Sequence, residues 1–193
     1  VNIGANKNSV GDERIKDYLI CLEKVYKYAD YITINISSPN TPNLRDLQNN
    51  ENLTILINAI DKNIKELDIH IPIFLKISPD ETDTTINNII AHVDNSMFSG
   101  IIATNTTIDK SMILNEGIKL IEGGLSGEPL MDKSTHCLSY IRSKSKDMHL
   151  IGVGGVLSKE DFNDKIDAGA SLVQIYTGFI IKGPNLINEV LSN

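Results

Sequence analysis

Cysteine and long apolar runs are both scarce in this sequence, and each scarcity excludes a class of protein. The 193 residues contain two cysteines, Cys21 and Cys137, and each lies in a stretch with a helical pattern. Two isolated cysteines neither form a zinc site by themselves nor indicate a disulfide framework, so we expect a reducing compartment. No apolar run approaches the roughly 18 residues that span a bilayer, so no membrane-spanning helix is predicted in these residues.

Basic residues are also too few to balance the acidic ones. Lysine and arginine number 18 against 25 aspartates and glutamates, which gives a formal net charge of −7. An acidic chain disfavours non-specific binding to nucleic acid or to an anionic membrane surface. With 41% hydrophobic and 22% charged residues, the composition is typical of a soluble globular protein. The length suits one domain with a sizeable core.

Six short runs rich in β-branched residues are predicted to be strands. Most are continuous apolar runs, which favours parallel strands covered on both faces. The first begins at residue 1 without an initiator methionine, which predicts that further residues precede it in the whole protein. The predicted strands are residues 1–4, 31–37, 71–77, 100–106, 150–155 and 172–177.

Apolar residues at three- and four-residue steps predict helices between these strands. One stripe runs over residues 15–29, a second over 53–67 and a third over 86–93. Ser158 is placed to cap a further helix, and Pro184 is placed to open the last one. Strands that alternate with helices, without a break in composition, predict one α/β domain with right-handed crossovers.

Polar residues gather at the carboxyl ends of the predicted strands. A doubly wound sheet concentrates such residues at one switch point, whereas a (β/α)8 barrel carries them on strand after strand. We therefore predict an α/β fold of the (β/α)8 TIM-barrel type, with about six of the eight strand–helix units present. The strand-end residues are 35–40, 76, 104–106, 154–155 and 176–177.

Glycines stand at the carboxyl end of the fifth predicted strand. The backbone amides of Gly152, Gly154 and Gly155, ahead of a helix, are suited to binding phosphate, although a tight strand–helix turn is the alternative. The third glycine of a Rossmann fingerprint and the P-loop motif are both absent. The next strand ends in a hydroxyl-bearing stretch, residues 174–178, and two such loops after the last two strands are typical of barrel phosphate sites. A phosphorylated cofactor is therefore predicted.

Two further segments have polar side chains where apolar ones are expected. Lys76 lies inside the apolar run 73–77, which favours a cation beside a cofactor that becomes anionic over an edge-strand lysine that reaches solvent. Residues 34–43 combine amides, hydroxyls and two prolines, and residues 104–107 repeat this chemistry on another strand. Such loops can present fixed donors and acceptors to a planar polar ligand. No metal cluster is predicted, because the four histidines share no spacing and are expected in helices or loops: His70, His92, His136 and His149.

These segments together resemble class 2 dihydroorotate dehydrogenases. The similarity covers essentially all of the chain in the family's order, and the loop after the second strand lacks the cysteine that serves as the base in class 1 enzymes. The segments that carry the resemblance are residues 1–4, 35–45, 103–107, 123–127, 151–155, 173–178 and 182–184.

The resemblance implies a flavin mononucleotide (FMN) barrel that oxidises (S)-dihydroorotate to orotate in de novo pyrimidine (UMP) biosynthesis and passes electrons to a quinone. By motif position, Ser38 would be the general base for the C5 proton while C6 delivers hydride to flavin N5. The implied substrate-binding residues are Asn35, Asn40, Asn105 and Thr106. The implied FMN-binding residues are Asn2, Asn35, Lys76, Thr104, Gly127, Gly154, Gly155, Tyr176 and Thr177.

The family also implies features outside these residues: two earlier strand–helix units, a helical segment for quinone and membrane, and peripheral attachment to the cytoplasmic face of a bacterial inner membrane. Two alternatives stay open, namely an inactive partial barrel and another FMN barrel oxidoreductase that acts on a reduced pyrimidine. Within the sequence, Asn43 replaces a usual glycine, so a left-handed backbone is predicted there at small cost. Glu128 stands where a non-acidic residue is usual, which predicts weaker anion binding nearby.

Overall fold

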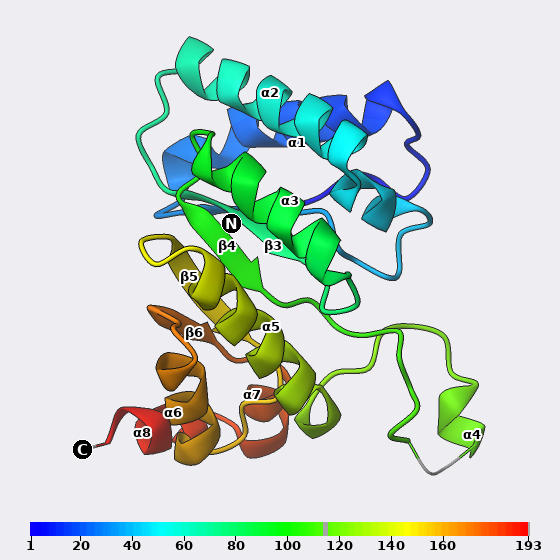
Figure 1. Ribbon diagram of the computed structural model, residues 1–193, viewed down its shortest axis with the longest axis vertical. Helices are drawn as coiled ribbons and strands as arrows, with labels where there is room; N and C mark the ends of the chain where they lie inside the picture. The colour runs from blue at the N-terminus through cyan, green and yellow to red at the C-terminus, as the bar shows by residue number, and fades with distance from the viewer. Residues whose placement is uncertain (114–115, 193) are drawn as a thin grey trace. The chain divides into compact units, whose positions relative to one another are not determined.

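The computed structural model describes residues 1–113 and 116–192, and the chain divides into two compact units. The first unit comprises Val1–Ile77 and Glu81–Ile102, and the second comprises Ser78–Asp80 and Ala103–Asn193. Strands and helices alternate along both units (Figure 1).

The first unit is built on strands that follow one another in sheet order. These are β1 (Asn2–Ile3), β2 (Ile32–Asn35), β3 (Ile73–Ile77) and β4 (Gly100–Ala103), whose last residue belongs to the second unit. β1 pairs with β2 and β2 pairs with β3, in both cases parallel. The register sets Asn35 opposite Lys76, so the carboxyl ends of β2 and β3 lie side by side.

Amphipathic helices cover the strands of the first unit. They are α1 (Asp12–Val25), α2 (Asn50–Glu66) and α3 (Asp83–Asp94), and α2 packs against both of the others (Figure 1). A 3-10 helix, η2 (Leu44–Gln48), precedes α2. The side chains of Asn49 and Thr82 cap α2 and α3 by accepting backbone N–H bonds, as short polar residues do at helix starts.

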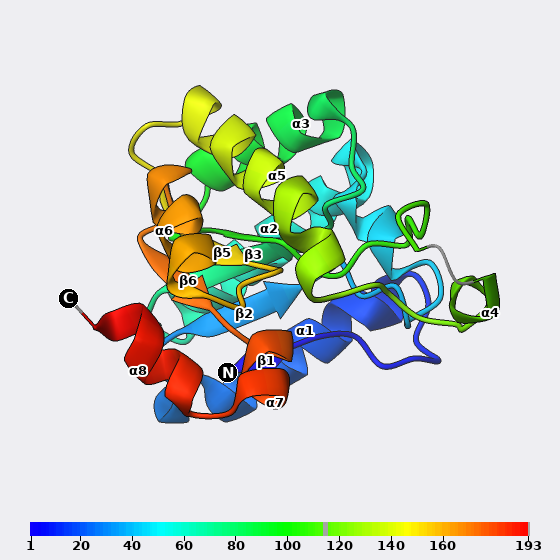
Figure 2. The same ribbon diagram turned by 90° about the horizontal axis from the view of Figure 1, so that it is seen from below.

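The second unit contains the parallel pair β5 (His149–Val153) and β6 (Leu172–Gln174). α5 (Met131–Lys144) and α6 (Lys159–Asp167) pack against β5, and α8 (Asn185–Leu191) packs against α6 and α7 (Thr177–Lys182) (Figure 2). Two shorter elements precede α5: α4 (Glu116–Lys119) and η3 (Glu128–Leu130).

The six predicted strands are all present; each is shorter than predicted at one end or both, and β5 begins one residue earlier than predicted. The polar residues after them lie in loops or helix starts: Tyr176 and Thr177, expected to end a strand, stand at the beginning of α7. His149, expected in a helix or loop, is the first residue of β5. Asn35 and Lys76, by contrast, lie inside β2 and β3 and are paired in the ladder.

The predicted helices are confirmed, but the buried face of α1 differs from the predicted apolar stripe. The first stripe ends as a 3-10 helix, η1 (Tyr26–Tyr28), and the buried residues of α1 are Arg14, Tyr18 and Leu22 instead of a stripe beginning at Ile15. Ser158 caps α6 by accepting the Asp161 N–H at 3.1 Å, and Pro184 directly precedes α8. No helix in residues 1–113 or 116–192 is both long and apolar enough to cross a bilayer.

Candidate functional site

The loop after β2 is tied to β3 and to α1. Ser37 is fully buried, and its Oγ lies 2.8 Å from the Lys76 carbonyl oxygen and 3.1 Å from Asn35 Oδ1. The Asn35 carbonyl accepts a 2.6 Å bond from the buried hydroxyl of Tyr18. Burial raises the pKa of Tyr18, so this hydroxyl keeps its proton and remains a donor. These bonds hold both the backbone and the side chain of Asn35 in place.

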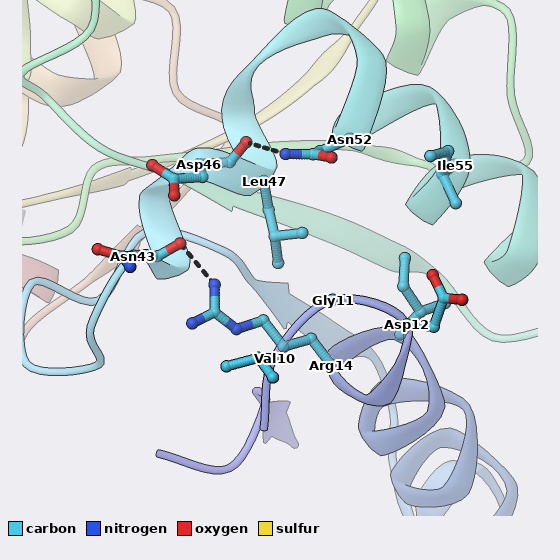
Figure 3. Close-up of a pocket in the computed structure, with 10 residues that line it drawn as sticks. Val10, Gly11, Asp12, Arg14, Asn43, Asp46, Leu47, Asn52 and Ile55 are labelled. Atoms are coloured by element: carbon cyan, nitrogen blue, oxygen red, sulfur yellow. Dashed lines mark hydrogen bonds between the residues drawn. The ribbon is translucent and has the colours of Figure 1, made fainter. Parts of the chain in front are cut away.

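Arg14 holds the far end of the same loop. Its guanidinium donates to the carbonyl oxygens of Ser9 at 2.8 Å, Asn43 at 2.6 Å and Pro42 at 2.5 Å. Figure 3 shows this side chain reaching from α1 to the Asn43 carbonyl, beside a cavity of about 270 Å³. Asn43 has φ 55°, which confirms the left-handed backbone predicted there. Arg14 escaped the sequence analysis, although its i, i+4, i+8 spacing with Tyr18 and Leu22 marks the buried face of α1.

Ser38 and Asn40 lie between these two anchors. Ser38 is half-buried and Asn40 is exposed, and the Ser38 Oγ accepts the Asn40 N–H at 3.3 Å. Arg45 donates from Nε to the Ser37 carbonyl at 3.1 Å, which fixes the peptide group that leads into Ser38. The Ser38 hydroxyl therefore sits on a restrained backbone with access to solvent.

Lys76 lies within β3, one residue before its end. In the strand register it stands opposite Asn35, while Asn2 stands opposite Thr33, two residues earlier on β2. Because side chains alternate along strands, Asn2, Asn35 and Lys76 lie on one face of the sheet. Burial lowers the pKa of Lys76, and among the described residues no carboxylate forms an ion pair with it. The ammonium is therefore partly desolvated.

The amide and hydroxyl groups after β4 form a compact local network in the second unit. Thr104 is buried, and its N–H donates to the Val153 carbonyl at 3.0 Å. The Asn105 Oδ1 accepts the Thr106 N–H at 2.8 Å, so the amide plane of Asn105 is fixed. This network holds the predicted residues Thr104, Asn105 and Thr106 in one orientation beside the end of β5.

An ion pair that the sequence analysis missed supports this network. Lys133 of α5 lies 2.6 Å from Asp80 Oδ1, and Asp80 also accepts the hydroxyl of Thr107 and the Ile108 N–H. The Asp80 side chain is only 12% exposed. The pair joins residues 78–80 to the loop after β4 and to α5, and the only signal in the sequence is an aspartate just after a predicted strand.

The glycine loop after β5 lies against the start of α5. Gly154 and Gly155 have φ of 119° and 83°, a region that side chains disfavour. A Cβ atom on Gly155 would stand 2.5 Å from the Met131 Cα, so only glycine allows this approach. The Gly154 carbonyl accepts the Ser134 hydroxyl at 3.1 Å.

The start of α7 and the loop before η3 adjoin the glycine loop. A Cβ on Gly178 would stand 2.1 Å from the Val156 carbonyl, and a Cβ on Gly127 would stand 3.2 Å from Thr177 Cγ2. The Thr177 hydroxyl donates to Ser126 Oγ at 3.0 Å. The second unit therefore brings together three predicted segments, around Gly127, Gly155 and Thr177. Tyr176 is 78% exposed at the edge of this group.

The described residues include no group of three or more His, Cys, Asp or Glu side chains arranged to hold a metal ion. The residues brought together after the strands supply amides, hydroxyls and backbone N–H groups, and Lys76 supplies a desolvated ammonium. Such donors suit a planar polar substrate and a phosphorylated cofactor.

A family model described as dihydroorotate dehydrogenase matches residues 1–193. The chain belongs to the dihydroorotate dehydrogenase family. Family members named dihydroorotate dehydrogenase (quinone) include one from Legionella pneumophila (strain Corby), 46% identical over 197 residues, and one from Aliivibrio salmonicida, 47% identical over 200 residues. Each alignment covers 100% of this chain and 59% of the relative, so the chain spans about three-fifths of their length.

Solved structures of the family carry the same fold. The structure of DHODH from Eimeria tenella in complex with ferulenol is 34% identical, with a TM-score of 0.92, and the match covers 98% of this chain and 55% of that one. The ligand-free form of the same enzyme matches with a TM-score of 0.90. These likenesses confirm the predicted fold class, a (β/α)8 barrel represented here by about six strand–helix units.

Proposed function

We propose that this chain is part of an FMN-dependent enzyme that oxidises (S)-dihydroorotate to orotate, with a quinone as electron acceptor, in pyrimidine biosynthesis. The observation that carries the proposal is the 45–47% identity, over essentially the whole chain, to relatives named dihydroorotate dehydrogenase (quinone). The family's dependence on a lipid-soluble quinone leads us to propose peripheral attachment to the cytoplasmic face of a bacterial inner membrane.

The second unit is suited to the phosphate end of FMN. Gly127, Gly154 and Gly155 all have positive φ, and their neighbours come so close that a Cβ atom would collide or crowd. Glycines of this kind allow backbone N–H groups to approach an anion directly. Together with Thr177 at the start of α7 and the exposed Tyr176, they are the residues we propose to hold the phosphate. Thr104 is proposed to contact the ring end.

The first unit is suited to the ring system of FMN. Asn2, Asn35 and Lys76 share one face, so two amides and one ammonium can contact the same planar ligand. Lys76 is desolvated without a carboxylate partner among the described residues, so a nearby negative charge would relieve the cost of its burial. We propose that Lys76 stabilises the charge that the ring acquires when it is reduced.

Bound FMN would supply the acceptor for the hydride that leaves C6 of dihydroorotate. We propose that Ser38 Oγ takes the C5 proton and releases its own hydroxyl proton to solvent, a route that its half-buried position supports. The C5–H and C6–H bonds break, the C5=C6 double bond forms, and the two electrons pass on to the quinone. The substrate's amide and carboxylate edges are assigned to Asn35, Asn40, Asn105 and Thr106.

The test is flavin absorbance under anaerobic conditions. The protein should be yellow as purified, bleach when dihydroorotate is added, and regain its colour when a quinone follows. Replacing Ser38 by alanine should leave flavin bound but slow bleaching by about 10²–10⁴-fold, the usual contribution of a general base. Ser143→Ala, which removes an exposed hydroxyl of α5, is the matched control and should bleach at the normal rate.

Each outcome separates one part of the proposal from another. A bound flavin that stays yellow with dihydroorotate would show that the substrate assignment is wrong and direct attention to other reduced pyrimidines. Bleaching of Ser38→Ala at the wild-type rate would remove Ser38 as the base. Protein that binds no flavin would overturn the cofactor assignment.

A further inference from the structure

Lys165 is a fully buried lysine that the proposed chemistry does not use. It lies on α6 with no exposed surface, and its stem packs beside Gly152 of β5, where a Cβ atom would stand 3.2 Å from the Lys165 Cβ. A buried ammonium is costly unless its donors are satisfied. Burial is the main influence on the pKa of Lys165 and lowers it to about 8.

The donors of Lys165 go to the first turn of α5. Its Nζ lies 2.6 Å from Ser134 Oγ, 2.6 Å from Thr135 Oγ1 and 3.4 Å from the Met131 carbonyl. Asp161 and Asp164 on α6 and Asp132 on α5 are near enough to favour the charged form, yet among the described residues none forms an ion pair with it. The ammonium is therefore bound by neutral oxygens.

One of those oxygens connects Lys165 to the glycine loop. With the ammonium donating to its oxygen, the Ser134 hydroxyl can donate in turn to the Gly154 carbonyl at 3.1 Å or to the Met131 carbonyl at 3.0 Å. The Met131 carbonyl already accepts the Thr135 hydroxyl at 2.8 Å, which favours Gly154 as the acceptor for Ser134. The result is a chain of hydrogen bonds from the buried cation to the loop.

The planarity of the peptide group lets this series of hydrogen bonds determine where the Gly155 N–H points. The Gly154 carbonyl and the Gly155 N–H belong to one planar trans peptide, so they point in opposite directions. Fixing the Gly154 carbonyl toward Ser134 of α5 therefore directs the Gly155 N–H away from Ser134. Successive hydrogen bonds also polarise one another, which makes this N–H a stronger donor.

We propose that Lys165 is a positioning residue for the phosphate of the cofactor: through Ser134 it orients the Gly154–Gly155 peptide so that its N–H faces the anion. This inference rests on the proposed function, since it takes FMN as the ligand of the glycine loop. Lys165 itself touches α5 and not the cofactor, so its effect is on how well the phosphate is held.

The experiment compares two flavins that differ only in the phosphate. Dissociation constants for FMN and riboflavin are measured on the full protein after exchange of its flavin, by quenching of flavin fluorescence. Lys165→Met, which keeps the apolar stem, should weaken FMN binding about tenfold, the value of one hydrogen bond, and leave riboflavin binding unchanged. Ser134→Ala should do the same. Ser143→Ala is the matched control, because it removes a hydroxyl of the same helix that bonds, among the described residues, only to the Tyr140 carbonyl, and it should change neither constant.

Equal weakening of FMN and riboflavin by Lys165→Met and Ser134→Ala would mean general damage to the unit and overturn the positioning role. Unchanged FMN binding in Ser134→Ala would also overturn it, even if Lys165→Met failed to fold. If Lys165→Met weakens FMN binding selectively but dihydroorotate does not bleach the wild-type flavin, the proposed substrate is wrong and the positioning role of Lys165 is still supported.

Discussion

Replacing Arg14 by methionine should loosen the segment that carries Ser38 and Asn40. Arg14 is 7% exposed, and its guanidinium donates to three backbone carbonyls, two of them at the end of this loop. Methionine keeps the apolar stem and removes every donor. Only its prolines, the Arg45 bond and the contacts of Ser37 would then hold the segment in its conformation.

The size of the effect follows from the surroundings of those carbonyls. A hydrogen bond from a charged donor contributes about 1.5–3 kcal/mol. The residues Pro42 and Asn43 are themselves exposed, so their carbonyls can bind water once Arg14 is gone, which recovers part of each bond. We therefore expect the free energy of unfolding to fall by about 2–4 kcal/mol, less than three full bonds.

Urea unfolding of the flavin-bound protein measures this loss of stability. The KM for dihydroorotate shows whether the loop that carries Ser38 and Asn40 still binds the substrate normally. The matched control is Lys16→Met, an exposed lysine on the same helix, which should change stability by less than about 0.5 kcal/mol. We expect Arg14→Met to raise KM while Lys16→Met leaves it unchanged. If the two variants unfold at the same urea concentration, the three bonds contribute nothing and the reasoning from Arg14 is wrong.

Three further predictions concern the second unit. Gly155→Ala should lower the melting temperature and the flavin content together, because its Cβ would stand 2.5 Å from backbone, whereas Gly11→Ala, with φ 53° and no atom within 4 Å, should show a small loss of stability alone. Asp80→Asn should destabilise the protein by about 1–3 kcal/mol in urea unfolding, since the Lys133 ammonium loses the nearer and more buried of its two carboxylate partners and keeps only Asp109 at 3.6 Å; no change would show that the Asp80–Lys133 pair is not stabilising. Between pH 8 and pH 10.5 the unfolded chain holds a proton on Lys165 that the folded protein has lost, so the free energy of unfolding should rise with pH, by about 2–3 kcal/mol in total. Lys165→Met should flatten that rise in urea titrations across this range, and an equal rise in the variant would assign the effect to other groups.

The strand–helix order and the positions of the polar strand ends could be predicted from local patterns. Continuous β-branched runs predicted all six strands, because parallel strands buried on both faces need apolar residues at each position. The backbone of Asn43 could also be predicted from the sequence. Asparagine is one of the few residues other than glycine that adopt φ near 55°, and it stands here where glycine is usual in the family. The errors lay at boundaries, as with Tyr176 and Thr177, where the same residues can end a strand or begin a helix.

The supporting residues could not be predicted in this way. Arg14 and Lys165 read as ordinary charged residues of surface helices, yet both are buried, with partners 29 and 31 residues away in the chain. Which face of α1 is buried differs by one residue from the apolar stripe, because an arginine with three carbonyl partners can occupy a core-facing position that a hydrophobic pattern assigns to its neighbour.

The sequence by itself therefore determined the order of the elements, the glycine and amide loops at the strand ends, and the family to which the chain belongs. These depend on residue type and short spacing, which the chain carries locally. Only the tertiary structure decided which charged side chains are enclosed and what they hold: Arg14 on the loop of Ser38, the Asp80–Lys133 pair, and Lys165 behind the glycine loop. The cost of burying a charge is set by oxygens from distant segments, and these meet only once the chain has folded.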